Sequence, residues 1–291
     1  MADHHARIFE VGPRDGLQNE AREITTGQKI HLINLLSQTG LSHIEAASFV
    51  SPKWVPGMAD SGEVMAGINR RSGVRYTALA PNMRGYEAGR AAGADEVAVF
   101  ASASEGFSQH NINCSIDESL QRFTPIVKQA SQDRIPVRGY LSCVISCPYD
   151  GPTEPTAVAK VAKSLFDLGC YEISLGDTIG AGDPVTVGTM LKAVVAEIPP
   201  DKLAGHFHDT GGYALANVEA SLAFGIRTFD SSVGGLGGCP YAPGAPGNVA
   251  TDEVVDLLER RGFDTGIDHD RLARVEDFLR EIGLTPTGQG Q

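Results

Sequence analysis

Leu-Ala-Gly-His-Phe-His, residues 203–208, begins the unit from which the fold is built. The segment Tyr213–Phe224 completes this unit. The first run is short and mostly apolar, which is typical of a buried strand. The second run has apolar residues at helical spacing, and it is followed by Gly225, a residue that commonly ends helices. The two runs together predict a strand followed by a helix.

The same unit recurs along the chain. Eight strands are expected: Ile8–Val11, His43–Ala47, Tyr76–Ala80, Glu96–Ala101, Val137–Cys143, Tyr171–Leu175, Leu203–His208 and Thr228–Ser232. The helices expected between them include Gln28–Gln38, Met83–Ala92, Glu118–Gln129, Thr156–Leu168, Pro184–Ala196 and Tyr213–Phe224. Eight such units without an intervening linker predict a closed (β/α)8 TIM barrel in the α/β class. A doubly wound open sheet is the alternative, but no Gly-x-Gly-x-x-Gly follows the first strand.

The length of 291 residues fits one barrel domain with an added C-terminal segment. We expect residues 1–291 to form a single catalytic domain, with residues 263–291 as a helical extension. The helix of this extension is expected at Arg271–Ile282, where it covers part of the barrel or contacts a partner subunit.

The composition excludes several classes of protein. Hydrophobic residues make up 42% of the chain and charged residues 21%, as in a folded globular protein. The net charge of −12 argues against a general nucleic-acid binder and against attachment to an anionic membrane. No apolar stretch is long enough to predict a membrane span.

The cysteine count and the N-terminal sequence indicate in which cellular compartment the protein is expected. An odd number of cysteines, five, does not predict a disulfide framework and favours a reducing environment. The first expected strand begins by Ile8, which leaves no room for a leader peptide. We therefore expect a cytoplasmic protein.

His206 and His208 stand two residues apart at the end of an expected strand. Residues at this spacing point to the same side of a sheet, so the two imidazoles can serve one divalent metal ion. The alternative is a pair of histidines that only form hydrogen bonds. In a barrel, catalytic groups lie at the C-terminal ends of the strands, where this pair is expected.

Other charged residues follow the expected strands. Arg14 and Asp15 lie in a turn after the first strand, and the alternative to a functional role is a surface ion pair. Glu45 is within an apolar run, where a carboxylate needs a partner; it is either part of the site or half of a structural pair with Arg14. Asp177 follows the sixth strand and is either a site residue or a turn aspartate.

A glycine-rich loop, residues 234–248, follows the eighth expected strand. Such a loop lets backbone approach a ligand closely, but it lacks the Lys and Ser/Thr of a nucleotide-binding P-loop. Cys239 in this loop is either a titrating thiol or an inert one. Asn248 at its end either caps the next helix or offers its amide oxygen to a metal.

Four of these groups come from strands 1, 7 and 8, which are neighbours in a closed barrel. They are Asp15, His206, His208 and Asn248. Two imidazole nitrogens and two oxygens would leave open positions for substrate in an octahedral shell. The ligand chemistry alone allows zinc, manganese, iron or magnesium.

Four segments carry a family resemblance. They are residues 11–20 (VGPRDGLQNE), 48–56 (SFVSPKWVP), 111–115 (NINCS) and 234–248 (GGLGGCPYAPGAPGN). The chain resembles the 3-hydroxy-3-methylglutaryl-CoA lyases, members of the metal-dependent lyase and synthase TIM-barrel superfamily, from about residue 7 to residue 258. The Arg-Asp turn and His-x-His are shared across that superfamily, whereas the extended turn and the glycine-rich loop are specific to the lyases.

The resemblance implies a role for each matching residue. Asp15, His206, His208 and Asn248 would bind Mg²⁺ or Mn²⁺. Arg14 would stabilise an enolate, Glu45 would position Arg14, and Asp177 and Cys239 would take part in proton transfer. The substrate would contact Arg14, Gln18, Ser48 and Asn111. The resemblance leaves open which of Cys239, Asp177 and His206 is the base and which is the acid.

The activity that the resemblance implies is cleavage of 3-hydroxy-3-methylglutaryl-CoA to acetoacetate and acetyl-CoA, the chemistry of leucine degradation, in a bacterial homodimer. Two details differ from the family pattern: Gly211-Gly212-Tyr213 after the histidine strand, and His110 where a lysine is common. Three alternatives remain: a lyase for longer 3-hydroxy-3-alkylglutaryl-CoA substrates, a related aldolase or Claisen synthase, and a non-catalytic scaffold.

Overall fold

The strands form a closed parallel barrel in the order β1-β10-β9-β8-β5-β4-β3-β2, so the predicted (β/α)8 barrel is confirmed. The computed structural model describes residues 4–18, 20, 22–237 and 247–284. The barrel strands are β1 (Arg7–Glu10), β2 (His43–Ser48), β3 (Arg75–Leu79), β4 (Glu96–Ser102), β5 (Val137–Ser142), β8 (Glu172–Asp177), β9 (Leu203–Phe207) and β10 (Thr228–Ser231). The short strands β6 (Ser146–Cys147) and β7 (Gly151–Pro152) form an antiparallel hairpin after β5.

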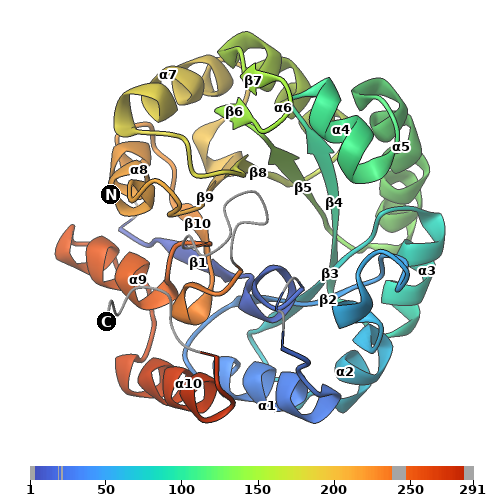
Figure 1. Cartoon of the computed structure of the whole chain (residues 1–291), viewed down its shortest axis with the longest axis vertical. Coiled ribbons are helices and arrows are strands. Elements are labelled where there is room, and N and C mark those ends of the chain that lie inside the picture. The colour runs from blue at the N-terminus through green and yellow to red at the C-terminus, as the bar shows by residue number, and fades with distance from the viewer. Residues whose placement is uncertain (1–3, 19, 21, 238–246, 285–291) are drawn as a thin grey trace.

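A ring of helices surrounds the barrel (Figure 1). The helices are α1 (Thr26–Leu36), α2 (Ser61–Gly67), α3 (Met83–Ala91), α4 (Glu105–Ile112), α5 (Ile116–Asp133), α6 (Pro155–Leu168), α7 (Pro184–Val195), α8 (Ala214–Leu222), α9 (Thr251–Arg260) and α10 (His269–Glu281). Among the described residues, no helix is long and apolar enough to cross a membrane.

Helix capping, backbone conformation and strand pairing explain why some helix and strand boundaries differ from the expected ones. Helix α1 begins before the expected Gln28, because Thr25 and Gln28 form a capping box around its first turn. Strand β5 ends at Ser142 because Cys143 has a left-handed backbone with φ of 60°, which a strand does not accommodate. Strand β8 continues to Asp177, since its pairing with β9 extends from Ile173 to Asp177.

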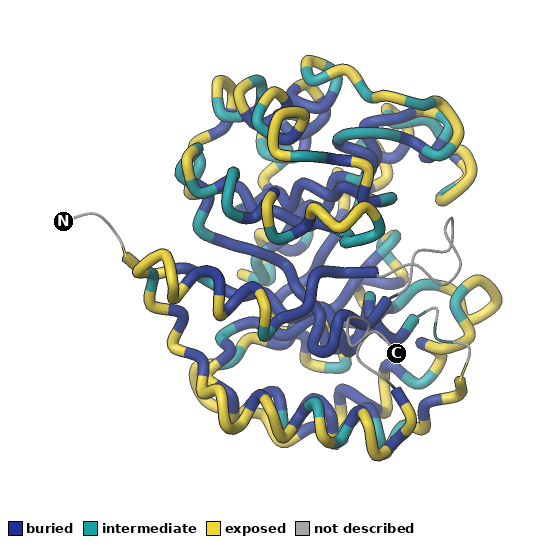
Figure 2. Tube along the Cα trace, turned by 60° about the vertical axis from the view of Figure 1, so that its left-hand side comes forward, coloured by how far each residue is buried: buried dark blue, intermediate teal, exposed yellow. Residues whose placement is uncertain are grey.

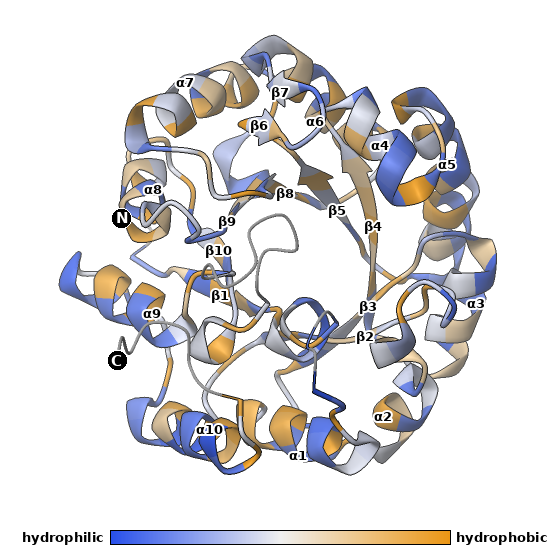
Figure 3. Cartoon of the chain, viewed as in Figure 1, coloured by the Kyte–Doolittle hydropathy of each residue, from blue (hydrophilic) through white to orange (hydrophobic). Residues whose placement is uncertain are grey.

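Apolar side chains fill the layer between the barrel and the helices. On α6, for example, Val158, Ala162 and Leu165 are fully buried at helical spacing, as an amphipathic helix requires. The barrel strands are mostly buried, whereas the helices alternate between buried and exposed residues (Figure 2). The helices also alternate between hydrophobic and hydrophilic residues (Figure 3). Burial of these faces holds the ring against the barrel.

The inside of the barrel is more polar than the apolar layers usual in this fold. Arg138 of β5 is fully buried there and forms ion pairs with Glu172 at 2.9 Å and with Asp230 at 2.7 Å. Its guanidinium carbon also lies 3.9 Å from the centre of the Phe9 ring. Arg7 contacts Glu172 from the N-terminal side. Removing one partner from such a buried network costs about 3–5 kcal/mol, because an unpaired charge remains.

Glu10 at the end of β1 connects the loops that surround the barrel mouth. Its carboxylate accepts hydrogen bonds from the backbone of Gly12 at 2.8 Å and of Val233 at 2.9 Å, and from the Thr251 hydroxyl at 2.7 Å. These partners belong to the turn after β1, the segment after β10 and the first residue of α9. One buried carboxyl therefore links the turn that carries Arg14 and Asp15 to the segment after β10 and to the start of α9, just after Asn248.

The helix of the C-terminal extension covers the barrel beside α1. His31 of α1 and Phe278 of α10 are in edge contact, with ring centroids 4.6 Å apart. The backbone N–H of Asp268, which caps α10, donates to Thr39 O at 2.7 Å. The prediction that this helix covers part of the barrel is confirmed, whereas the assignment of residues 1–291 to one catalytic domain stays a prediction.

We expect Glu10 to make the stability of the barrel depend on pH. Burial raises the pKa of the Glu10 carboxyl from 4.5 to about 7, so between these values the folded protein binds more protons than the unfolded chain. Its contribution to stability is full below pH 4.5 and is lost as the pH rises towards 7. Relative to Glu10→Gln, which does not titrate, the free energy of unfolding of the unchanged protein should fall by about 1–3 kcal/mol across this window.

The measurement is urea unfolding of both proteins in chelator-containing buffer on either side of this window. Other titrating groups, including Glu96, are common to the two proteins and cancel in the difference. A difference that stays constant with pH would show that Glu10 does not titrate there.

Candidate metal centre and active site

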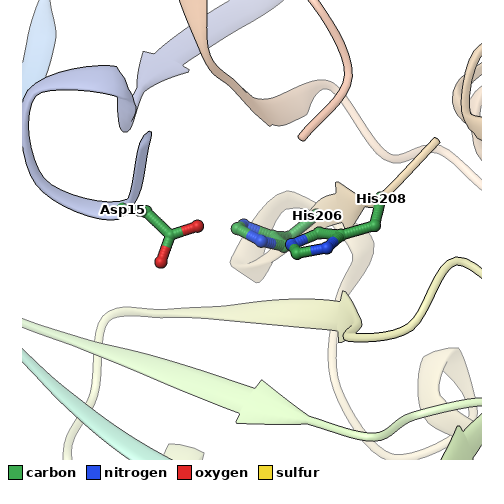
Figure 4. A group of neighbouring side chains, drawn as sticks. All are labelled: Asp15, His206 and His208. Carbon is green, nitrogen blue, oxygen red and sulfur yellow. The ribbon is translucent and has the colours of Figure 1, made fainter. Parts of the chain in front are cut away.

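Three predicted ligands meet at the mouth of the barrel. Asp15 follows β1, His206 lies in β9 and His208 follows β9, and one ligand atom from each lies within 4.8 Å of the others. The Asp15 carboxylate points towards the two imidazole rings, whose centroids are 5.4 Å apart (Figure 4). The spacing of two residues therefore places both histidines on one side of the sheet, as the sequence predicted.

A tight turn places Asp15 in this position. Residues Gly12–Gly16 form a single π-helical turn, in which the backbone N–H groups of Arg14 and Asp15 donate to Val11 O. A β-carbon on Gly16 would lie 2.8 Å from the Ser232 hydroxyl, so only glycine lets the turn approach the segment after β10 this closely. The glycines of the Arg-Asp turn thus bring β1 and β10 loops together.

Asn248, the fourth predicted ligand, lies against the same carboxylate. Its amide nitrogen donates to Asp15 Oδ2 at 2.9 Å and to Leu236 O at 3.2 Å, and its backbone forms a bridge with His208. The alternative that Asn248 caps the next helix is wrong, because the N-cap of α9 is Ala250, without a side-chain cap. The structure therefore brings all four predicted ligands together.

The donors present fit a divalent metal ion. Nδ1 of His208 is buried without a hydrogen-bond partner among the described residues, and buried polar atoms are rarely left so. Burial and the neighbouring His206 lower the pKa of His208 to about 4, which keeps its nitrogen lone pair free. Burial would raise the pKa of Asp15, but Arg14 and the two histidines outweigh it and lower that pKa to about 2. An ionised carboxylate and a neutral imidazole are the forms that bind metals.

Arg14 lies beside the candidate metal group. Its guanidinium contacts Glu45 Oε2 at 2.6 Å and Asp15 Oδ1 at 2.6 Å. Arg14 is 6% exposed and Glu45 is fully buried, so the alternative of a surface ion pair is wrong. The pairing of Glu45 with Arg14, expected in either interpretation of Glu45, is confirmed. These carboxylates hold the guanidinium at the edge of the metal group.

Several buried polar atoms in the barrel mouth have no hydrogen-bond partner within residues 4–18, 20, 22–237 and 247–284. They are Glu45 Oε1 and Ser48 Oγ of β2 and the Tyr140 hydroxyl of β5, all from inward-facing positions of the barrel. The Tyr140 ring lies 5.4 Å from the guanidinium carbon of Arg14. Because burial of an unpaired polar atom costs about 1–3 kcal/mol, these atoms are suited to bind a polar ligand.

The predicted substrate contacts lie at different distances from this mouth. Gln18 is beside the metal group, since its amide nitrogen donates to Asp15 Oδ1 at 3.2 Å. Ser48 is buried at the end of β2. Asn111 lies in the last turn of α4, where it is exposed to solvent. Only a ligand that extends outwards along the rim would contact all three.

Asp177 faces away from the metal group. It is in register with Phe207, one residue after the pair Gly176 and His206, so its side chain points towards the helices. Its carboxylate accepts hydrogen bonds from the backbone of Ala181 at 3.1 Å and Gly182 at 2.7 Å. These contacts are those of a turn aspartate, the alternative considered from the sequence. Burial raises the pKa of this carboxyl, and its part in proton transfer stays a prediction.

Cys239 lies outside the described residues, so the predicted acid is not placed here. Sequence reasoning also missed two residues of the mouth, Tyr140 and Asp230. Asp230 lies inside the eighth expected strand, Thr228–Ser232, where a buried carboxylate needs a partner, as was argued for Glu45. The buried tyrosine gave no comparable signal, because aromatic residues are common in strands.

Comparison with known proteins identifies the relatives. The HMGL-like family model matches residues 5–279. A hydroxymethylglutaryl-CoA lyase of Pseudomonas mevalonii is 58% identical over 269 residues, 92% of this chain and 89% of that protein. A 3-hydroxy-3-isohexenylglutaryl-CoA/hydroxymethylglutaryl-CoA lyase of Pseudomonas aeruginosa is 59% identical over 262 residues, 90% of this chain and 87% of that protein.

Solved structures agree in fold. The HMG-CoA lyase of Brucella melitensis is 60% identical, with a TM-score of 0.95 over 97% of this chain and 99% of that one. An HMG-CoA lyase of Acinetobacter baumannii, solved with coenzyme A and 3-methylmalate, is 38% identical, with a TM-score of 0.93 over 99% and 95%. The resemblance seen in the sequence motifs is confirmed, and the chain belongs to the HMGL-like family.

Proposed function

We propose that the protein is a lyase that cleaves 3-hydroxy-3-methylglutaryl-CoA to acetoacetate and acetyl-CoA. The observation that carries this proposal is the group of Asp15, His206 and His208 with Arg14 beside it, at the mouth where barrel enzymes act. The names of relatives that cover most of the chain support the same substrate. They do not favour the alternatives of a lyase dedicated to longer 3-alkyl substrates or of a synthase.

Asp15, His206, His208 and Asn248 would hold Mg²⁺ or Mn²⁺, as the mixed oxygen and imidazole donors suggest. When bound, the ion would supply Lewis acidity that lowers the pKa of a tertiary hydroxyl. Coordination through Asn248 would use its amide oxygen, because its amide nitrogen already donates to Asp15. The carboxylate contributes a negative charge that favours a divalent cation.

The reaction needs charge to move from the hydroxyl to the thioester. A base takes the hydroxyl proton, the C2–C3 bond breaks, and its electron pair forms the enolate of acetyl-CoA. Arg14 would donate hydrogen bonds to the enolate oxygen, where negative charge develops. Glu45 keeps the guanidinium in place, so little reorganisation is needed during the reaction.

A proton must then return to C2 of the enolate. We propose that Cys239 is the acid, because its glycine-rich loop follows the strand next to the histidines. Asp177 would act with it by holding the loop of residues 178–182 through its two backbone hydrogen bonds.

The substrate would enter as an acyl-CoA thioester. Arg14, Gln18 and Ser48 would contact its acyl end, and Asn111 on the outer rim would contact the coenzyme A portion. The Acinetobacter relative solved with coenzyme A supports this class of ligand. We further propose a cytoplasmic homodimer that uses no nucleic acid or membrane partner.

The function is tested by incubating the purified protein with 3-hydroxy-3-methylglutaryl-CoA and measuring acetoacetate and acetyl-CoA. Both products should form with Mg²⁺ or Mn²⁺, disappear after chelation and return when the metal is restored, because the ion activates the hydroxyl. His206→Ala should lose metal stimulation while keeping the circular dichroism spectrum of the barrel. If neither this substrate nor longer 3-alkyl homologues are cleaved with either ion, the protein would be a binding scaffold.

Arg14→Lys should lower kcat by about 10²–10³-fold with a smaller change in KM, since the planar guanidinium would contact charge that forms only in the transition state. Arg70→Lys is a matched control, because Arg70 also pairs with a carboxylate and lies 5.2 Å from a tyrosine ring, outside the mouth. Steady-state kinetics of both variants make the comparison. Equal kcat values for the two lysine variants would remove Arg14 from the mechanism.

Cys239→Ser should lower kcat by about 10²–10⁴-fold, because serine is a far weaker acid than cysteine. Cys170→Ser is the control: Cys170 is buried just before β8, at the opposite end of the strand from the mouth. Rates are compared at saturating substrate and metal. Turnover by Cys239→Ser within about two-fold of the unchanged protein would exclude the thiol as the acid.

A further inference from the structure

Asp230, in the middle of β10, contacts a predicted metal ligand from inside the barrel. Its Oδ2 lies 3.1 Å from Nδ1 of His206 on the adjacent strand. Asp230 and His206 are in register, so both side chains point inwards. Asp230 is fully buried and belongs to none of the residue sets that the sequence motifs identified.

The two histidines of the metal group are held differently. An ionised carboxylate only accepts hydrogen bonds, so Nδ1 of His206 must carry the proton in this contact. The neutral ring then leaves Nε2 without a proton, as a metal ligand requires. Nδ1 of His208, by contrast, is buried and has no hydrogen-bond partner in the part of the chain that the structure describes. The contact with Asp230 therefore fixes the ring orientation and the tautomer of His206. No described residue makes a comparable contact with Nδ1 of His208.

Asp230 is itself held in place on every side. Arg138 donates to Oδ1 at 2.7 Å and to Oδ2 at 3.0 Å, and the Ser174 hydroxyl donates to Oδ2 at 2.7 Å. Arg138 is anchored in turn by Glu172 at 2.9 Å. These three donated hydrogen bonds keep the carboxylate ionised and restrict its rotation, so the position of His206 is set by the interior of the barrel.

We propose that Asp230 is a positioning residue that fixes His206 as the Nδ1–H tautomer, with Nε2 directed to the metal. Arg138 and Ser174 hold Asp230 for this task. The inference rests on the proposed metal-dependent function. Partners of this kind commonly change metal affinity by about 10–100-fold when they are removed, without contacting the ion.

The first test is Mn²⁺ affinity of the full chain by titration calorimetry, without substrate. In Asp230→Asn the new amide group can donate to Nδ1, which favours the tautomer with a proton on Nε2. We expect its Kd for Mn²⁺ to rise by about 10–100-fold. Glu172→Gln is the matched control, because Glu172 pairs with the same buried arginine but does not contact His206. Because Glu172 reaches His206 only through Arg138 and Asp230, its Kd for Mn²⁺ should rise clearly less than that of Asp230→Asn.

Two outcomes of this titration would overturn the proposal. One is an unchanged Kd in folded Asp230→Asn. The other is an equal loss in Glu172→Gln and Asp230→Asn, which would mean that damage to the buried ion pairs alone weakens the site. If the unchanged protein itself does not bind Mn²⁺, the proposed metal-dependent function fails, and this result is distinct from a failure of the Asp230 proposal.

A second measurement needs no variant at position 230. Nitrogen-15 spectra of histidine-labelled, metal-free protein report which ring nitrogen of His206 carries the proton. At a pH well above the ordinary imidazole pKa, His206 should be the Nδ1–H tautomer. Its signals are assigned through their loss in His206→Ala. An Nε2–H tautomer for His206 would contradict the proposal even if Asp230→Asn cannot be purified.

Discussion

The buried ion pair between Arg138 and Asp230 determines how charge is neutralised inside the barrel and how one predicted metal ligand is oriented. It places opposite charges 2.7 Å apart inside the barrel, where apolar layers are usual. The pair is satisfied by Glu172 and Ser174, so neither charge is left without partners. The same carboxylate contacts His206 at the mouth. The carboxylate that neutralises the buried Arg138 thus also orients His206 of the candidate metal centre.

Strand register divides the polar residues into two groups with different tasks. Inward-facing residues such as Asp230, His206 and Tyr140 line the interior or the mouth. Outward-facing Glu10 and Asp177 instead accept hydrogen bonds from the backbone of the loops. Because alternate residues of a strand point to opposite faces, each strand end can both contribute to the site and hold its surrounding loops.

The barrel mouth brings together side chains of opposite charge that neutralise one another. Two carboxylates, Asp15 and Glu45, surround Arg14, and two imidazoles face Asp15. A divalent cation would satisfy the side of Asp15 that faces the imidazoles, while the unpaired oxygen of Glu45 and the Tyr140 hydroxyl are available to a polar ligand. An ion bound by Asp15 would supply Lewis acidity beside a guanidinium paired with the same carboxylate, which would suit a reaction in which charge moves from a hydroxyl to a thioester.

The amino-acid sequence alone determined the eight-fold repeat, the barrel and the four groups expected around one ion, because strand and helix periodicity and position at strand ends are local properties. Local patterns also left choices open. Whether Asn248 caps a helix, whether Arg14 is buried and which way Asp177 points were decided only by tertiary structure, through register and packing between strands distant in the chain. The contact between Asp230 and His206 belongs to this second class: it depends on the pairing of β10 with β9, and no spacing within either strand encodes it.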